Sequence, residues 1–214
     1  FPTDKGRFRI ATLDEELEMI QWLNRATGRT VGIYPEIKRP AWHRAEGIDL
    51  GKRLLQVLDE HGYRQRAHAA FVQCFDADEL TRLREDLGCD LKLIQLIGEN
   101  AWGESDTDYD ALRTRKGLER LAGIVDGIGP WVEQLYTPGK SGRPKSTGLA
   151  GEAGKLGLEV HPYTFRADDL APGFHSFAEM VGWFARGLTV DGLFTDFPDL
   201  ARQALERSHA SNGT

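Results

Sequence analysis

Short apolar segments alternate with amphipathic segments along almost the whole chain, and this alternation restricts the fold more than any other feature. Each of the six strand-like segments is followed by a helix or by a segment of helix length. Repeated units of this kind with right-handed crossovers give a parallel sheet, either open and doubly wound or closed into a barrel. No glycine-rich phosphate fingerprint follows any of them, which favours a barrel. The predicted strands are 31–38, 69–75, 91–97, 125–129, 157–161 and 192–197.

Capping residues indicate where the predicted helices begin. Thr12 and Glu15 form a predicted capping box, in which each side chain bonds the other residue's backbone amide, and the same pattern recurs at 176–179. Asp76 and Glu79 are predicted to cap the helix after the second strand. Helix ends are predicted where glycine follows the last apolar residue of the pattern, at Gly28, Gly62 and Gly88.

Charge and composition limit the possible partners. The 214 residues include 27 Lys and Arg against 33 Asp and Glu, a net charge of -6, and the basic residues are scattered. Nucleic-acid binding is therefore disfavoured. The absence of a membrane-length apolar stretch and of a signal-peptide pattern at residues 1–5 predicts a soluble chain without stable membrane insertion. The chain also begins without Met, which suggests a piece of something longer.

The segment Val31 to Lys38 carries the clearest functional signal. Strand alternation places Tyr34, Glu36 and Lys38 on one face, with the carboxylate and the ammonium at the carboxyl end of the strand. Parallel α/β proteins build their ligand sites at that end. Glu36 can hold a cation and Lys38 an anion. The alternative is an edge strand with a solvated Glu and Lys.

Other polar and aromatic residues are predicted to converge on the same end of the sheet. Each has a structural alternative: His161 can be a hydrogen-bonded core residue, Gln73 can brace a neighbouring strand, and Asp196 can cap the last helix. A single glutamate with oxygen donors favours Ca²⁺ or Mg²⁺ over zinc, although these ions need more oxygen ligands than one carboxylate supplies. The predicted ring comprises Glu36, Lys38, Gln73, Phe75, Gln95, Asp126, His161, Tyr163, Asp196 and Phe197.

Two connecting segments, 98–116 and 131–145, are too long to be simple connectors. Long loops in a compact α/β domain commonly form lids or substrate walls, and disorder is the alternative.

Five motifs follow one another along the chain: Tyr34 to Lys38, Gln73 to Asp78, Asp126 to Pro130, His161 to Thr164 and Gly192 to Asp199. In this order they resemble the bacterial periplasmic-type glycerophosphodiester phosphodiesterases. The resemblance implies a TIM (β/α)8 barrel and the hydrolysis of glycerophosphodiesters to an alcohol and sn-glycerol 3-phosphate with Ca²⁺ or another divalent ion such as Mg²⁺. It also implies a role in glycerol and lipid metabolism and a periplasmic or extracellular location.

The same resemblance implies residue roles. Glu36 matches a metal ligand of the family, and Lys38 matches the lysine that contacts the substrate phosphate. Looser matches suggest that Gln73, Phe75, His161 and Tyr163 line the pocket for glycerol or phosphate.

The chain departs from the family at its start. The family's His-Arg-Gly motif, Glu-x-Asp metal pair and second catalytic histidine all precede the Glu-x-Lys strand, and none is found here. We therefore expect residues 1–214 to be an N-terminally incomplete phosphodiesterase domain with barrel strands three to eight only, inactive alone, with no catalytic residue and with the catalytic groups upstream of Phe1. A six-stranded remnant would expose two sheet edges and invite pairing or aggregation.

Two alternatives remain at this point. One is a non-catalytic module that binds a phosphate ligand, or another partner, on a barrel scaffold. The other is a lysophospholipase D type activity, which requires an apolar groove for an acyl chain that the polar segments 98–116 and 131–145 do not indicate.

Overall fold

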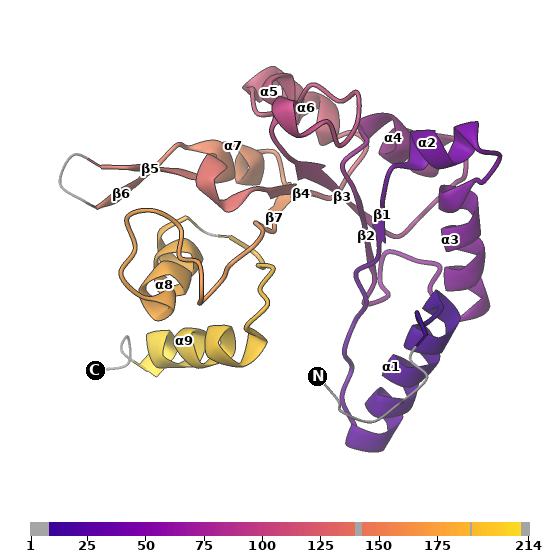
Figure 1. Cartoon of the computed structure of the whole chain (residues 1–214), viewed down its shortest axis with the longest axis horizontal. Coiled ribbons are helices and arrows are strands. Elements are labelled where there is room, and N and C mark those ends of the chain that lie inside the picture. The colour runs from indigo at the N-terminus through magenta and orange to yellow at the C-terminus, as the bar shows by residue number, and fades with distance from the viewer. Residues whose placement is uncertain (1–8, 140–142, 189, 211–214) are drawn as a thin grey trace.

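A computed structural model describes residues 9–139, 143–188 and 190–210, and the side chains as far as residue 206. Its centre is a parallel sheet in the order β1-β2-β3-β4-β7, and β5 and β6 form a separate antiparallel hairpin (Figure 1). The strands are β1 (Glu36–Ile37), β2 (Phe71–Cys74), β3 (Lys92–Ile97), β4 (Gly127–Pro130), β5 (Tyr136–Pro138), β6 (Pro144–Ser146) and β7 (Glu159–Val160).

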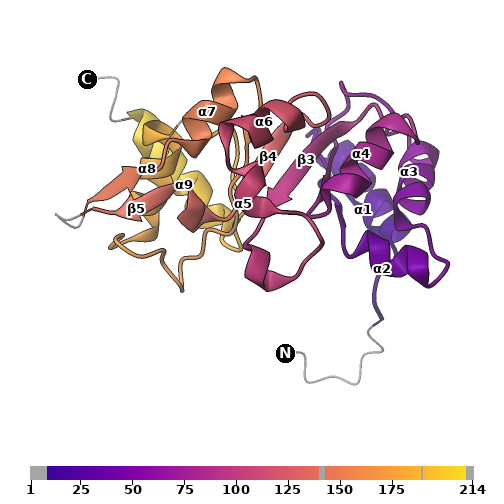
Figure 2. The same ribbon diagram turned by 90° about the horizontal axis from the view of Figure 1, so that it is seen from above.

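Helices surround the sheet on its outer side and at both flanks. Seen from above, β3 and β4 lie between the side that carries α1 to α4 and the side that carries α7 to α9 (Figure 2). The α-helices are α1 (Leu13–Thr27), α2 (Pro40–Ala45), α3 (Leu50–Glu60), α4 (Ala77–Glu85), α5 (Tyr109–Leu112), α6 (Arg115–Leu121), α7 (Leu149–Lys155), α8 (Phe177–Gly187) and α9 (Pro198–Ala210). Two short 3-10 helices, η1 (Asn100–Trp102) and η2 (Val132–Gln134), lie in the two long connections.

The predicted alternation of strands and helices is confirmed for five of the six strands. The sixth predicted strand, 192–197, contributes a single parallel bridge between Thr195 and Phe165. Phe194 donates to the carbonyl of Pro162 and accepts from the amide of Phe165, so this segment still runs beside the continuation of β7. Because Pro162 has no amide hydrogen to donate, the ladder between the two segments is interrupted.

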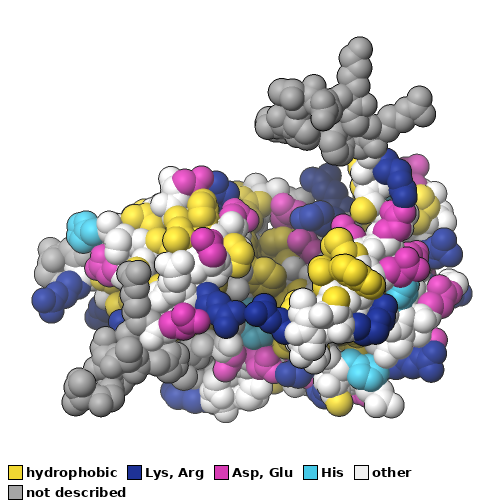
Figure 3. All heavy atoms as spheres, turned by 90° about the horizontal axis from the view of Figure 1, so that it is seen from below, with side chains coloured by type: hydrophobic (Ala, Val, Ile, Leu, Met, Phe, Trp, Pro, Cys, Tyr) yellow, Lys and Arg dark blue, Asp and Glu magenta, His cyan; other side chains and the backbone are white. Residues whose placement is uncertain are grey.

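Strand alternation separates a helix-facing side of the sheet from an inner side. Ile37, Cys74 and Val160 are buried on the outer side, where the helices pack. The inner side faces a hollow lined with hydrophobic side chains, which opens between the N-terminal and C-terminal halves (Figure 3). Within the described sheet, β1 and β7 are edge strands of two residues each, and such short edges offer little to pair with another chain.

The predicted cap is confirmed at all three of these helix starts, but two of the predicted glutamate partners have other roles. Thr12 and Glu15 form the reciprocal box at the start of α1. Ser176 accepts from the Glu179 amide at α8, but the Glu179 carboxylate bonds the amide of His175. At α4, Asp76 is the cap, whereas Glu79 is fully buried and bonds two arginines.

Gly127 gives a first prediction. A Cβ at this position would lie 2.5 Å from the Glu159 carbonyl oxygen and 2.8 Å from Cδ1 of Ile94, so Gly127→Ala forces β4 away from its neighbours. We expect a loss of about 1–3 kcal/mol in the free energy of unfolding, measured by urea denaturation. Gly151, inside α7, has open space around its Cβ position, so Gly151→Ala is expected to stabilise by about 0.5–1 kcal/mol. Equal effects of the two substitutions would contradict this explanation.

Candidate active site

A cavity of about 260 Å³ lies at the carboxyl ends of β1, β2 and β3. Five of the six residues predicted to bind metal or substrate line it, which leaves His161 outside the lining. The segments around 163 and 194, from the C-terminal half, form the opposite wall. The lining residues are Glu36, Lys38, Gln73, Phe75, Leu96, Tyr163, Thr164 and Phe194.

The register between β1 and β2 places the polar residues together. Glu36 pairs directly with Gln73, so both side chains leave the sheet at the same level and on the same face. Nζ of Lys38 lies 2.8 Å from Oε1 of Glu36, and the Lys38 side chain is 74% exposed whereas that of Glu36 is 22% exposed. Gln73 is buried, and its Oε1 accepts no hydrogen bond from the described residues. The cavity thus presents a carboxylate, an ammonium and an unpaired amide oxygen.

Tyr163 and Phe75 form an aromatic wall that is fixed to the sheet. The Tyr163 hydroxyl donates to the Ile97 carbonyl at 2.9 Å, and its ring meets that of Phe75 edge to face at 5.9 Å. Burial raises the pKa of Tyr163, which keeps the phenol neutral and able to donate. The wall is therefore uncharged and held in place by β3.

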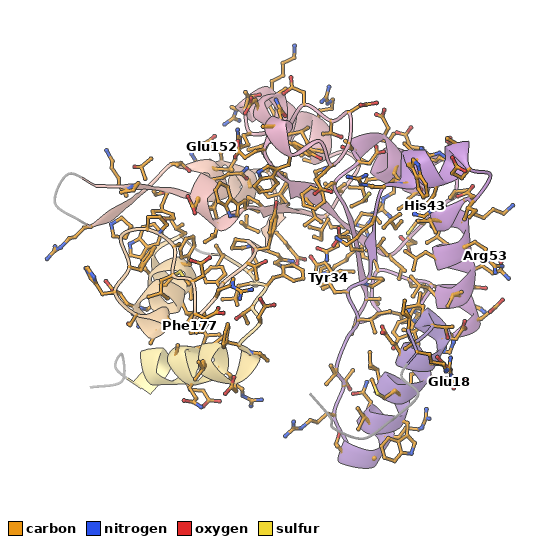
Figure 4. The ribbon with its side chains drawn as sticks, viewed as in Figure 1. Glu18, Tyr34, His43, Arg53, Glu152 and Phe177 are labelled. Carbon is orange, nitrogen blue, oxygen red and sulfur yellow. The ribbon has the colours of Figure 1, made fainter. Side chains whose placement is uncertain are left out.

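The two halves of the chain meet through aromatic side chains below this cavity. The ring of Tyr34 stacks on Phe71 and meets Phe194 edge to face, both at 4.8 Å between ring centroids. Figure 4 shows Tyr34 on the inner side of the sheet, between the two halves. Nδ1 of His161 lies 2.9 Å from the Tyr34 hydroxyl. Because Tyr34 and Phe71 precede Glu36 and Gln73 by two residues on their strands, this cluster lies one layer closer to the amino ends.

His161 belongs to that lower layer. It is 6% exposed, its Nε2 lies 3.3 Å from Oε2 of Glu159, and its ring meets Phe71 edge to face. Burial lowers the pKa of His161 although Glu159 and Asp191 oppose the shift, so the imidazole is neutral near pH 7. In this structure it braces Tyr34 and does not reach the cavity.

The lowered pKa of His161 predicts how stability depends on pH. The unfolded chain protonates this histidine below about pH 6.5, whereas the folded chain resists protonation. Below about pH 6.5 the unfolded state therefore binds more protons than the folded state. The free energy of unfolding keeps the stabilising contribution of the neutral His161 above that pH and loses it as the pH falls. We expect His161→Gln to reduce the slope of the free energy of unfolding between about pH 7 and pH 5.5. His175→Gln, at an exposed histidine, is the control variant measured beside it. An unaltered slope in His161→Gln would contradict the assignment.

Besides His161, four members of the predicted ring lie outside the cavity lining: Gln95, Asp126, Asp196 and Phe197. Asp126 precedes β4 and therefore lies at the amino end of the sheet, where it accepts from Arg66, from Arg84 and from the Leu93 amide. Gln95 is fully buried on the other face, and its amide donates to the Phe75 and Leu96 carbonyls. The prediction that these two side chains reach the carboxyl end of the sheet on its inner side was wrong. Asp126 comes before its strand, and strand alternation places Gln95 on the helix-facing side.

Asp196 accepts from Arg166 at 2.8 Å, an ion pair in place of the predicted cap, and the Phe197 amide bonds the Thr195 hydroxyl. Phe197 packs against Phe177 of α8, outside the cavity. The sequence reasoning also missed three lining residues. The alternation of β3 could have identified Leu96, whereas Thr164 and Phe194 lie in irregular segments without a strand pattern.

Residues 1–200 match the family model described as the glycerophosphoryl diester phosphodiesterase family. The chain belongs to this family. Among curated relatives, a glycerophosphodiester phosphodiesterase of Haemophilus influenzae is 35% identical over 96% of this chain, and one of Treponema pallidum is 31% identical over 94%. The chain spans 61% of the length of each of these two relatives.

Solved structures confirm the fold class of this family member. A candidate glycerophosphoryl diester phosphodiesterase from Silicibacter pomeroyi superposes with a TM-score of 0.64 at 21% identity, covering 91% of this chain and 56% of the other. A second one, from Agrobacterium tumefaciens, gives a TM-score of 0.60 at 16% identity, covering 94% and 65%. The fold is therefore the α/β type of the phosphodiesterase barrel, here with five parallel strands in the described sheet.

The described residues of this phosphodiesterase family member do not form a metal site by themselves. Glu36 is the only carboxylate that lines the cavity, and the described part of the chain contains no group of three or more His, Cys, Asp or Glu arranged to hold an ion. Ca²⁺ and Mg²⁺ require about six or more oxygen ligands. The same described residues include no helix long and apolar enough to cross a bilayer.

Proposed function

We propose that the protein takes part in the hydrolysis of small glycerophosphodiesters to an alcohol and sn-glycerol 3-phosphate. The observation that carries this proposal is the pairing of Glu36 with Lys38 inside one cavity, next to the unpaired amide oxygen of Gln73. Membership of the family and the names of the curated relatives support the reaction class.

Each polar group has a role that suits its position. Lys38 extends into solvent and can turn from Glu36 to a phosphate oxygen, where its charge offsets the negative charge of the diester. The Gln73 amide oxygen can accept from a glycerol hydroxyl. Tyr163 and Phe75 exclude water from one side of the cavity. The structure thus offers a phosphate contact, a hydroxyl contact and an apolar wall.

Glu36 is proposed as one ligand of a divalent ion, Ca²⁺ or Mg²⁺, whose remaining ligands would come from outside the described residues. Such an ion, when bound, polarises phosphoryl oxygens. Because the described lining of the cavity contains one carboxylate and no histidine, we propose that the 214-residue chain binds the glycerophosphate group while turnover needs further groups. A periplasmic or extracellular location is a further proposal, supported by family resemblance alone.

Two measurements test the proposed function. The first is the binding of sn-glycerol 3-phosphate to the 214-residue chain by isothermal titration calorimetry. The second is release of glycerol 3-phosphate from glycerophosphocholine, with and without Ca²⁺, by this chain and by a chimera that adds the unmatched part of the Haemophilus influenzae relative. Binding by the chain together with Ca²⁺-dependent release by the chimera would support the proposal.

The same measurements separate the alternatives. Binding without release in either protein would favour the non-catalytic phosphate-ligand module, a possibility consistent with the single carboxylate in the described cavity. Release by the 214-residue chain itself would show that its own groups are sufficient for turnover. Absence of both binding and release would reject the proposal.

A further inference from the structure

A second cavity, of about 420 Å³, adjoins the candidate active site. The two cavities share Tyr163 and Thr164 in their linings, so a ligand whose phosphate lies at Lys38 can extend past Tyr163 into the second cavity. Two tryptophans line this cavity: Trp102, at the end of η1, and Trp131, just before η2. Their rings meet at 5.4 Å with an interplanar angle of 66°. The cavity therefore has an indole-rich wall at one end of the candidate site.

Hydrogen bonds between the two long connections fix these tryptophans. The Gln134 amide donates to the Gly98 carbonyl at 2.8 Å and to the Glu99 carboxylate at 2.7 Å, and its oxygen accepts from the Trp131 backbone amide. A Cβ at Gly98 would lie 2.8 Å from Cε3 of Trp102, so the indole packs directly on this glycine. Both indoles are thus positioned before any ligand binds, which lowers the entropic cost of binding.

The charged groups of the second cavity that have no salt-bridge partner among the described residues are both carboxylates. Its lining includes the carboxylates of Glu133 and Asp169, and neither forms a salt bridge with another described residue. Arg166 also lines the cavity, but its guanidinium is already bonded to Asp168 at 2.7 Å and to Asp196 at 2.8 Å. Partial burial and the neighbouring Asp169 raise the pKa of Glu133. Glu133 and Asp169 can therefore both attract a cationic ligand from solution.

We propose that this second cavity binds the alcohol portion of the substrate and selects alcohols that carry an ammonium group, quaternary ammonium above all. The inference rests on the proposed function, because it places the phosphate at Lys38. Tryptophan faces attract quaternary ammonium ions, and nearby carboxylates add a Coulombic attraction that a neutral or anionic alcohol does not receive. Glycerophosphodiesters of amino alcohols are then preferred over those of glycerol or inositol.

Choline and its uncharged carbon analogue, 3,3-dimethylbutan-1-ol, provide the test, because they have the same shape and differ in charge. Binding to the 214-residue chain is followed by the indole N–H signals in ¹⁵N NMR spectra. We expect choline to shift the Trp102 and Trp131 signals with saturation and to bind about tenfold more tightly than the analogue. Glu133→Gln combined with Asp169→Asn should remove most of that difference while both indole signals still respond.

A matched tryptophan provides the control. Trp42 is 57% exposed on α2 and lines a different cavity, so Trp42→Ala should leave choline binding unchanged, whereas Trp102→Ala should weaken it at least tenfold. Equal affinity of the unmodified chain for choline and the analogue would overturn the inference, as would shifts confined to Trp42. Because this readout needs no turnover, choline binding by the 214-residue chain together with no hydrolysis by the chimera would reject the proposed function alone. Hydrolysis of choline and glycerol diesters by the chimera at equal rates, without choline binding by the 214-residue chain, would reject this inference alone.

Discussion

Glu79→Ala is expected to lower the free energy of unfolding by about 3 kcal/mol, the largest stability effect of any substitution considered. The Glu79 side chain is 0% exposed and bonds Arg44 of α2 and Arg82 of α4. Burial raises the pKa of Glu79, and the two arginines oppose this shift. Removal of the carboxylate leaves both guanidinium groups, 33% and 24% exposed, without their shared partner in a partly desolvated position.

Urea denaturation followed by circular dichroism at pH 7 measures this effect. Glu85→Ala is the matched control, because Glu85 lies in the same helix and is exposed, and it should change the free energy of unfolding by less than about 0.5 kcal/mol. Gly51 packs so closely that its Cβ would lie 2.2 Å from Oε1 of Glu79. Gly51→Ala should therefore also destabilise. A loss below about 1 kcal/mol for Glu79→Ala would show that solvent reaches the arginines and replaces the carboxylate.

Lys38→Ala is expected to weaken the binding of sn-glycerol 3-phosphate by roughly tenfold to a hundredfold, the range for loss of one charge-assisted hydrogen bond. The reason is that Lys38 is the only cationic side chain among the described residues that line the cavity. Titration calorimetry without divalent ions measures the dissociation constant. Lys155→Ala, at an exposed lysine that pairs with Glu152, is the control and should leave the affinity unchanged.

Substitution of Glu36 is expected to change the affinity for sn-glycerol 3-phosphate in the opposite direction. Without a divalent ion its carboxylate competes with the phosphate for Lys38, so Glu36→Gln should tighten binding of glycerol 3-phosphate. With Ca²⁺ present, Glu36→Gln should instead abolish any ion-dependent gain in binding or release. Weaker binding by Glu36→Gln in metal-free buffer would contradict the idea that the Glu36 carboxylate and the ligand phosphate compete for Lys38.

Local rules predicted much of the scaffold, because the features that specify it are short-range. The capping box at Thr12, the cap at Asp76 and the apolar strand patterns depend on neighbours within a few residues. The parallel order of the strands follows from their helical crossovers. The same reasoning brought Glu36 and Lys38 to the carboxyl end of β1, where the structure places them.

Long-range pairing explains what the sequence did not reveal. Glu79 fits a capping pattern, yet its partner Arg44 lies in α2, 35 residues away along the chain, and no local signal shows this pairing. His161 shares a face with Tyr163, but its contact with Tyr34 comes from the other half of the chain. The segments 98–116 and 131–145 contain no long periodic pattern. Their structure depends on Gln134, which joins the two loops by hydrogen bonds.

The contact between Tyr34 and Phe194 also affects how the protein is made. During synthesis the strand that bears Glu36 and Lys38 leaves the ribosome well before Phe194, on the opposite wall, emerges. Until then Tyr34 lacks its edge-to-face partner, and the cavity is an open surface. A nascent chain should therefore acquire affinity for a glycerophosphate ligand only after Phe194 has emerged and packed against Tyr34.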